Sequence, residues 1–160
     1  MDSGEEEERY TVTGAAGQDR PDLAVRLGLQ AHPEGGWYRR LWSAGEQVDT
    51  GRGRRPAATA IHYLLGPGEQ SRRHRVACDE LWLWHSGSPL SLTHAAEPSA
   101  ATASTTLLGP DPAAGQALWA AVPAGRWQCA RPVGDDPVLV TCVVAPGFDW
   151  ADFTLLPGDH

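Results

Sequence analysis

Short apolar segments separated by closely spaced glycine and proline turns run through most of this chain. Turns such as Gly66-Pro67-Gly68, Gly109-Pro110 and Pro146-Gly147 interrupt the apolar pattern before a long helix could form. Many short strands with almost no helix predict a β-sandwich or a β-barrel. The sequence also contains no G-x-G-x-x-G or P-loop motif, so a nucleotide-binding α/β fold is not expected.

The predicted fold class is therefore all-β, with antiparallel strands and one short N-terminal helix. The helix is expected after Pro21, with Leu23 and Leu27 on one face and Gly28 at its end. Residues 43–56, which contain three arginines, are expected to form an exposed loop. Outside the central segment described below, strands are expected at residues 37–42, 57–65, 89–94, 105–108, 117–122, 127–131, 138–145 and 150–155.

Length and charge limit the domain organisation and the partners. A chain of 160 residues fits one domain, which we place at residues 19–160 after a disordered acidic tail at residues 1–18. The formal charge of -7 argues against a nucleic-acid partner, which would require a basic surface. No apolar run approaches the roughly 18 residues of a membrane span and the N-terminus is acidic, so no membrane contact and a cytoplasmic location are expected.

The segment Gly68–Gly87 contains the residues best suited to proton transfer or metal binding. Because successive side chains of a strand point to opposite faces, Glu80 shares its face with Trp82 and Trp84. A carboxylate between two indoles needs a raised pKa, a cationic partner or a metal. His74, in the preceding strand, could point into the same cavity as Glu80. We interpret His74 and Glu80 as candidate catalytic residues, with a structural histidine–carboxylate pair as the alternative.

Two motifs in the chain resemble those of the cupin superfamily. The first, with Gly68, His74, Glu80 and Gly87, has the cupin spacing but carries Val76 where a second histidine belongs. The second, Pro123-x-Gly125, is followed by Gln128 instead of histidine. Five further blocks in the same order extend the similarity over about residues 23–156 to the single-domain Cupin_5-type branch: HPEGGWYRR, HRVACDELWLWHSGSPLSL, LLGPDPAAGQ, VPAGRWQCARP and VAPGFDWADFTLL.

The resemblance implies a jelly-roll barrel, a small-molecule ligand inside it, and a homodimer. It does not imply a reaction, because this fold supports many chemistries. Matched position by position, it gives His74, Glu80 and Gln128 as a metal-ligand set, which would favour weakly bound Mn, Fe or Mg. The alternative for Gln128 is a hydrogen bond to a ligand or to the Glu80 carboxylate.

Further candidate ligand-binding residues come from the neighbouring segments. Glu34 lies in the His32–Gly36 loop, which could cover the mouth of the barrel or could simply turn the chain. Arg39 is a candidate clamp for an anionic group, or a solvated strand charge. Tyr63, Trp82 and Trp84 could form an aromatic wall, or part of the core.

Three functions remain open at this point. The first is an enzyme that uses Glu80 or His74 as a general base in an isomerase, epimerase or lyase-type step, with possible help from a weakly bound divalent metal. The second is a non-catalytic cupin that binds a small polar metabolite. A metal-dependent oxygenase is less favoured, because Val76 and Gln128 replace two imidazoles.

Overall fold

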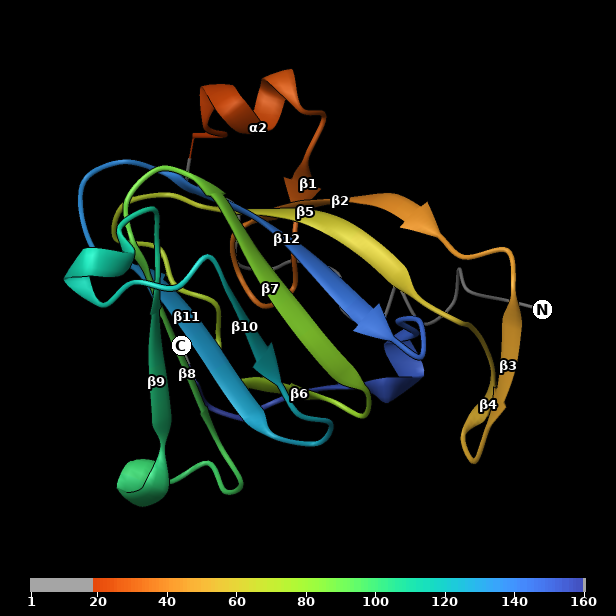
Figure 1. Cartoon of the computed structure of the whole chain (residues 1–160). Helices are drawn as coiled ribbons and strands as arrows, with labels where there is room; N and C mark the ends of the chain where they lie inside the picture. Colours follow the sequence, from red (N-terminus) through yellow and green to blue (C-terminus); the bar gives the residue numbers. More distant parts are fainter. Residues whose placement is uncertain (1–18, 160) are drawn as a thin grey trace.

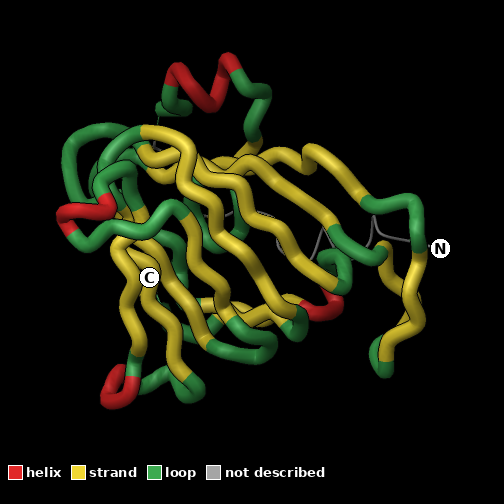
Figure 2. Tube along the Cα trace, viewed as in Figure 1, coloured by secondary structure: helices red, strands yellow, loops and turns green. Residues whose placement is uncertain are grey.

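Two antiparallel sheets face each other across an apolar interior in the computed structural model, which describes residues 19–159 (Figures 1 and 2). The predicted acidic tail therefore lies outside the described residues. The larger sheet contains, in spatial order, β1 (Gln30–Ala31), β2 (Trp37–Ser43), β5 (Thr59–Leu65), β12 (Val138–Ala145), β7 (Asp79–Ser86) and β10 (Trp119–Val122). The smaller sheet contains β13 (Phe153–Leu155), β6 (His74–Val76), β11 (Trp127–Pro132), β8 (Leu90–Ala95) and β9 (Ser104–Leu108).

Strands that are distant in the sequence lie side by side in both sheets. β12 pairs with β5 on one edge and with β7 on the other, while β11 lies between β6 and β8. Such long-range antiparallel pairing is the jelly-roll arrangement, and the all-β prediction is confirmed. In the described part of the chain, three short 3-10 helices complete the connections: η1 (Ala100–Thr102), η2 (Pro112–Ala114) and η3 (Trp150–Asp152).

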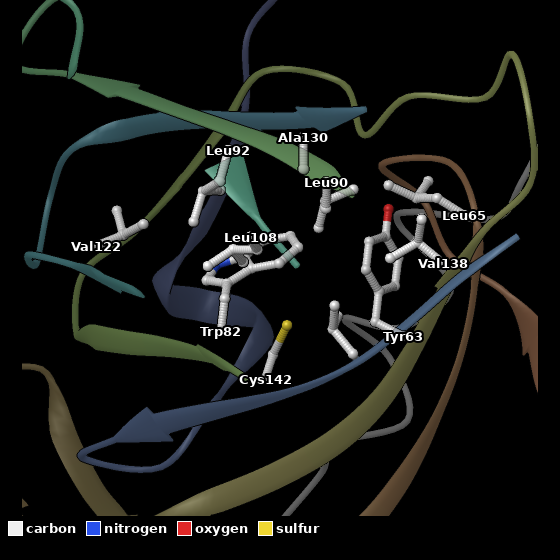
Figure 3. Close-up of a cluster of buried hydrophobic side chains, with 11 residues drawn as sticks. Tyr63, Leu65, Trp82, Leu90, Leu92, Leu108, Val122, Ala130, Val138 and Cys142 are labelled. Carbon is white, nitrogen blue, oxygen red and sulfur yellow. The ribbon is translucent and has the colours of Figure 1, made fainter. Parts of the chain in front are cut away.

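The core lies between the sheets and is filled mainly by inward-facing strand residues (Figure 3). Trp82 and Tyr63 are the largest fully buried side chains, and their rings meet edge to face with centroids 5.8 Å apart. Glu80 and Trp82 are buried whereas Leu81 is exposed, so the predicted alternation along β7 is confirmed. The other buried members of this cluster are Leu65, Leu90, Leu92, Leu108, Val122, Ala130, Val138, Val140 and Cys142.

The predicted helix is α2 (Asp22–Arg26), which begins after Pro21 as expected. It lies on the outer face of the larger sheet (Figure 1), where Ala24 packs in a second apolar cluster with Leu29, Trp37 and Leu64. No helix within residues 19–159 is long and apolar enough to cross a membrane.

Two segments differ from the sequence-based expectation. Residues 43–56 are not simply an exposed loop, because they include a hairpin of β3 (Gln47–Thr50) and β4 (Gly53–Pro56), seen at the edge of the molecule in Figure 1. Asp152 explains the hairpin, since it binds two of the three arginines. The expected strand at residues 150–155 is a strand only from Phe153; before it, Asp149 caps η3 by accepting a hydrogen bond from Ala151 N.

Gly87 occupies a backbone conformation that requires glycine. Its φ is +97°, and a Cβ atom placed there would lie 1.8 Å from the carbonyl oxygen of Pro137. We expect Gly87→Ala to lower the free energy of unfolding by about 3 kcal/mol or more, measured by urea denaturation. Gly68→Ala is the matched control, because Gly68 has φ +78° with no atom within 4 Å, and only the left-handed strain of about 1–2 kcal/mol applies. Equal losses in the two variants would contradict this explanation.

Candidate functional site

A cavity of about 860 Å³ lies between the two sheets, beside the apolar core. Its charged lining includes the exposed Arg40 and the half-buried Asp149. Four further acidic or imidazole side chains come from different elements: His32 and Glu34 from the loop after β1, His74 from β6 and Glu80 from β7. All four are buried, with at most 7% of the residue surface exposed. The two strands β6 and β7 belong to opposite sheets and do not pair side by side, which was the arrangement considered from the sequence. Both His74 and Glu80 nevertheless line the same cavity.

The loop that carries Glu34 packs tightly against two other backbone segments, at Gln70 and at Leu64. A Cβ on Gly35 would lie 2.8 Å from the carbonyl oxygen of Gln70, and one on Gly36 would lie 2.7 Å from that of Leu64. Both glycines also have positive φ values. The glycine pair thus allows close backbone packing that turns Glu34 inward, which corresponds to the chain-turning alternative.

His74 and Glu34 form a buried ion pair. His74 Nε2 lies 2.9 Å from Glu34 Oε2, and its Nδ1 lies 2.7 Å from the backbone carbonyl oxygen of Arg72. That carbonyl can only accept, so Nδ1 carries a proton. Burial lowers the pKa of His74, but the Glu34 carboxylate outweighs it and raises the pKa to about 9. At neutral pH His74 is therefore an imidazolium that donates through both nitrogens, and Glu34, whose pKa is lowered by His74 against the effect of burial, is a carboxylate.

Glu80 is held by a short chain of hydrogen bonds. Trp82 Nε1 donates to Gln128 Oε1 at 3.0 Å, and Gln128 Nε2 donates to Glu80 Oε2 at 2.9 Å. An indole N–H can only donate, so the Gln128 amide has one possible orientation and must present its NH₂ group to Glu80. Burial raises the pKa of Glu80 to about 7, although the positive charge of His74 opposes the shift. Near neutral pH this carboxyl group can both accept and donate a proton.

The residues of the predicted metal set do not fit a metal ion in this arrangement. The Gln128 carbonyl oxygen, the atom that would bind a metal, already accepts from Trp82. Both His74 nitrogens carry protons and have acceptors, so neither has a lone pair for a metal. Within residues 19–159 there is also no group of three or more His, Cys, Asp or Glu side chains placed to hold a metal ion. Gln128 instead binds the Glu80 carboxylate, the alternative weighed from the sequence.

An aromatic cluster lines the cavity beside this polar group, and the ring of Phe153 stacks on that of His74 with centroids 5.5 Å apart. Trp150 lies at its centre, with ring centroids 4.9 Å from Phe148 and 5.3 Å from Phe153. His32 lies 4.6 Å from Tyr38 and 5.6 Å from Trp150. Burial lowers the pKa of His32 to about 4, so this imidazole is neutral near pH 7. The cavity therefore brings buried titratable groups into direct contact with a lining of aromatic rings.

The remaining predicted ligand-binding residues do not line the cavity. Tyr63 and Trp82 belong to the core, and Trp84 packs against it with its Nε1 donating to the Ser88 carbonyl oxygen (Figure 3 shows Tyr63 and Trp82). Arg39 is exposed on the opposite face of β2, where its Nη1 donates to the Leu27 carbonyl oxygen. Its neighbour Arg40 lines the cavity in its place.

Several cavity residues were missed by sequence reasoning. Tyr38 and Arg40 share one face of β2 by simple alternation, so the pattern alone could have identified them once the inner face was known. Cys142 also lines the cavity, but an isolated cysteine in an apolar strand carries no signal of this kind. Phe148 follows the expected Pro146-Gly147 turn, whereas Trp150 and Phe153 lie in the segment 150–155 that was expected to be a strand. No sequence pattern placed the three rings together.

The fold and the cavity define a cupin-type barrel with a buried polar site. The chain belongs to the family Cupin_5, described as Cupin superfamily (DUF985), whose profile matches residues 21–156. It is similar to the structure of a hypothetical protein from Leishmania major, at 32% identity and a TM-score of 0.76 over 84% of this chain and 85% of that chain. A protein from Shewanella oneidensis has 34% identity and a TM-score of 0.76 over 87% of this chain and 85% of that chain.

More distant structures share the fold alone. One is a cupin 2 conserved barrel domain protein from Rhodopseudomonas palustris, at 14% identity and a TM-score of 0.54 over 78% of this chain and 69% of that chain. A search of the curated proteins found no significant match. The resemblance inferred from the two motifs is thus confirmed as family membership.

The His74–Glu34 pair predicts a pH-dependent stability. Because the folded-state pKa of His74 is raised from 6.5 to about 9, the pair's stabilisation is fully present below pH 6.5 and is lost as the pH rises through 9. Between about pH 7.5 and about pH 9, the free energy of unfolding should fall by on the order of 2 kcal/mol more in the wild type than in Glu34→Gln. Urea denaturation at several pH values measures the difference, and identical slopes would refute the ion pair.

Proposed function

We propose that this protein is an enzyme that transfers protons on a small polar metabolite bound in the cavity, in an isomerase, epimerase or lyase-type step. The observation that carries the proposal is Glu80: a cavity-lining carboxyl group, buried, fixed by Gln128, with a pKa of about 7. A general acid–base group is most effective when its pKa lies near the working pH. A carboxyl group that served only to stabilise the barrel would not need to face the cavity.

The neighbouring charges suit such a step. Ionised Glu80 would accept a proton from the substrate and return it at another position. His74 already directs both N–H groups to Arg72 and Glu34, so it acts as a fixed positive charge rather than as a proton donor. That charge would stabilise negative charge developing on the substrate. Glu34 keeps the imidazolium in place.

The lining also bears on the kind of molecule that would bind. The aromatic lining of the cavity, centred on Trp150, would contact an apolar or ring-shaped part, while Glu34 and Glu80 would receive hydroxyl or amine hydrogens. Arg40, which lines the cavity but is exposed, is placed at its solvent side, where it could contact an anionic substituent. A cavity of about 860 Å³ is in the size range of metabolite sites.

Two alternatives have less support. A non-catalytic ligand-binding protein would use the same cavity without needing a titratable group with a pKa near 7. A metal-assisted reaction with Mn, Fe or Mg, including an oxygenase, would require Gln128 and His74 to give up their present partners. The proposed mechanism therefore involves no metal.

Deuterium incorporation tests the proposal even though the substrate is not identified. A metabolite extract in D₂O is incubated with the protein and analysed by mass spectrometry, because a proton-transfer enzyme exchanges substrate hydrogen even at equilibrium. We expect one metabolite to gain deuterium with the wild type, and Glu80→Gln to reduce the rate by about 100-fold or more.

Two controls make this test specific. Glu97→Gln makes the same chemical change on the exposed surface and should incorporate deuterium at the wild-type rate. A chelator should leave the wild-type rate unchanged; strict dependence on added Mn(II) or Fe(II) would contradict the metal-free mechanism. If no metabolite exchanges while one still co-purifies with both wild type and Glu80→Gln, the protein is a binder and the enzyme proposal fails.

We also propose that the protein forms a homodimer through the outer face of the larger sheet. Strand register places apolar residues side by side across this face, from Trp42 through Ala60, Val143 and Leu81 to Ala121. Trp42 is 52% exposed and Leu81 38% exposed. Trp42, Leu81 and Ala121 are exposed, and Ala60 and Val143 between them are half-buried. An apolar row of this kind across five strands is typical of a surface that is covered by another protein.

The dimer is tested by molar mass. Light scattering after size-exclusion chromatography should give twice the mass of the 17.1 kDa chain at micromolar concentration. Leu81→Arg should shift the mass to that of one chain, because an unpaired charge would be buried in the interface. Val133→Arg, at an exposed apolar residue outside this row, should remain dimeric. A monomeric wild type would refute the proposal.

A further inference from the structure

The arginine-rich segment between β2 and β5 supplies no charged group to the site described above, although Pro56 at its end lines the cavity. Two of its three arginines are directed toward one acid. Arg52 Nε lies 2.9 Å from Asp152 Oδ1, and Arg55 Nε lies 3.0 Å from Asp152 Oδ2. Arg55 Nη2 adds a third hydrogen bond, at 3.2 Å, to Oδ1. The side chain of Asp152 is only 1% exposed and that of Arg55 only 8%. Such a fork-shaped, buried contact fixes position as well as charge.

The acid belongs to the segment that builds the aromatic side of the cavity. Asp152 is the last residue of η3, directly between Trp150 and Phe153, which both line the cavity. Asp152 itself does not line it. The arginines therefore bind the cavity wall on the side that is turned away from the cavity. They belong to a hairpin that contributes no charged group to the cavity.

Other contacts tie the same wall to the same part of the chain. Gly147 N donates to the Pro56 carbonyl oxygen at 2.7 Å, at the end of β4, and Phe148 N donates to Thr59 Oγ1 at 2.9 Å. These contacts anchor the start of the segment, whereas Asp152 anchors its end. Between the two anchors, Trp150 packs against His32 and Tyr38 through ring contacts.

We propose that the β3–β4 hairpin acts as a clasp, in which Arg52 and Arg55 bind Asp152 and thereby hold residues 147–153 in the conformation that forms the aromatic wall. Arg52, Arg55 and Asp152 are positioning residues: they touch no ligand, but they set the shape of the ring-lined part of the cavity. The consequence for ligand binding rests on the proposed function. The structural consequence does not, because it concerns the order of the wall in the empty protein.

Hydrogen–deuterium exchange of the full chain tests the clasp without any ligand. In Asp152→Asn, an isosteric change that removes the charge, the amides of residues 148–152 should exchange about tenfold faster or more than in the wild type. Arg55→Ala should do the same, and Arg52→Ala, which removes the partner with 41% side-chain exposure, should have a smaller effect in the same residues. The amides of β7 and β12 should keep their wild-type exchange rates.

Arg54→Ala is the matched control on the same strand, because its exposed side chain lies next to Arg55 and its backbone carbonyl, which accepts from Arg55 Nη1, is retained. Wild-type exchange at residues 148–152 in folded Asp152→Asn and Arg52→Ala would overturn the clasp. So would faster exchange spread equally over β7 and β12, which would mean general destabilisation. A protein without proton-transfer activity but with the predicted exchange pattern would refute the proposed function and leave the clasp standing.

Discussion

The burial of two carboxyl groups and an imidazolium in one cavity is the constraint on which the site depends. An isolated buried charge is costly, and the barrel meets this cost differently for each group. Glu34 and His74 neutralise one another at 2.9 Å, so both stay charged near neutral pH. Glu80 has no cation in direct contact among the described residues; the Gln128 amide and the Cys142 thiol donate hydrogen bonds to it, and burial raises its pKa to about 7. The same low-polarity surroundings thus produce a permanent ion pair and a titratable acid.

The two cupin motifs keep their spacing in this chain, but two of their histidine positions hold other residues. Val76 and Gln128 occupy positions that the cupin motifs assign to histidine, and the structure gives each a definite place. Val76 packs in the apolar cluster with Phe153, while Gln128 binds both Trp82 and Glu80. Replacing an imidazole with an amide whose oxygen is already bonded converts a potential metal ligand into a support for an acid.

The fold could be predicted from the sequence because it follows from local rules. Turn residues, strand alternation and the start of α2 after Pro21 all depend on near neighbours, and they were predicted correctly. The same alternation indicated that His74 and Glu80 could point into one cavity. Glu34 was identified from its glycine-flanked loop, but its pairing with His74 could not be, because the contact depends on how that loop packs against β5.

The errors share a physical cause: they involve contacts between distant segments. Arg39 was chosen instead of Arg40 because the sequence does not show which face of β2 points inward. The helix α2 packs near Trp37 on the outer face, but this contact exists only in the folded protein. Residues 43–56 resembled a loop because their ordering partner, Asp152, lies far along the chain. The orientation of Gln128 depends on one indole N–H from the other sheet, which no spacing rule contains.

The central claim, that Glu80 is an acid–base group with a pKa near neutrality, can be measured directly. The side-chain carboxyl carbon of Glu80 can be followed by ¹³C NMR during a pH titration of the labelled protein and assigned by its absence in Glu80→Gln. We expect a midpoint at about pH 7. A midpoint near the ordinary glutamate value of 4.5 would show that Glu80 is a permanently ionised group at neutral pH and would contradict the account.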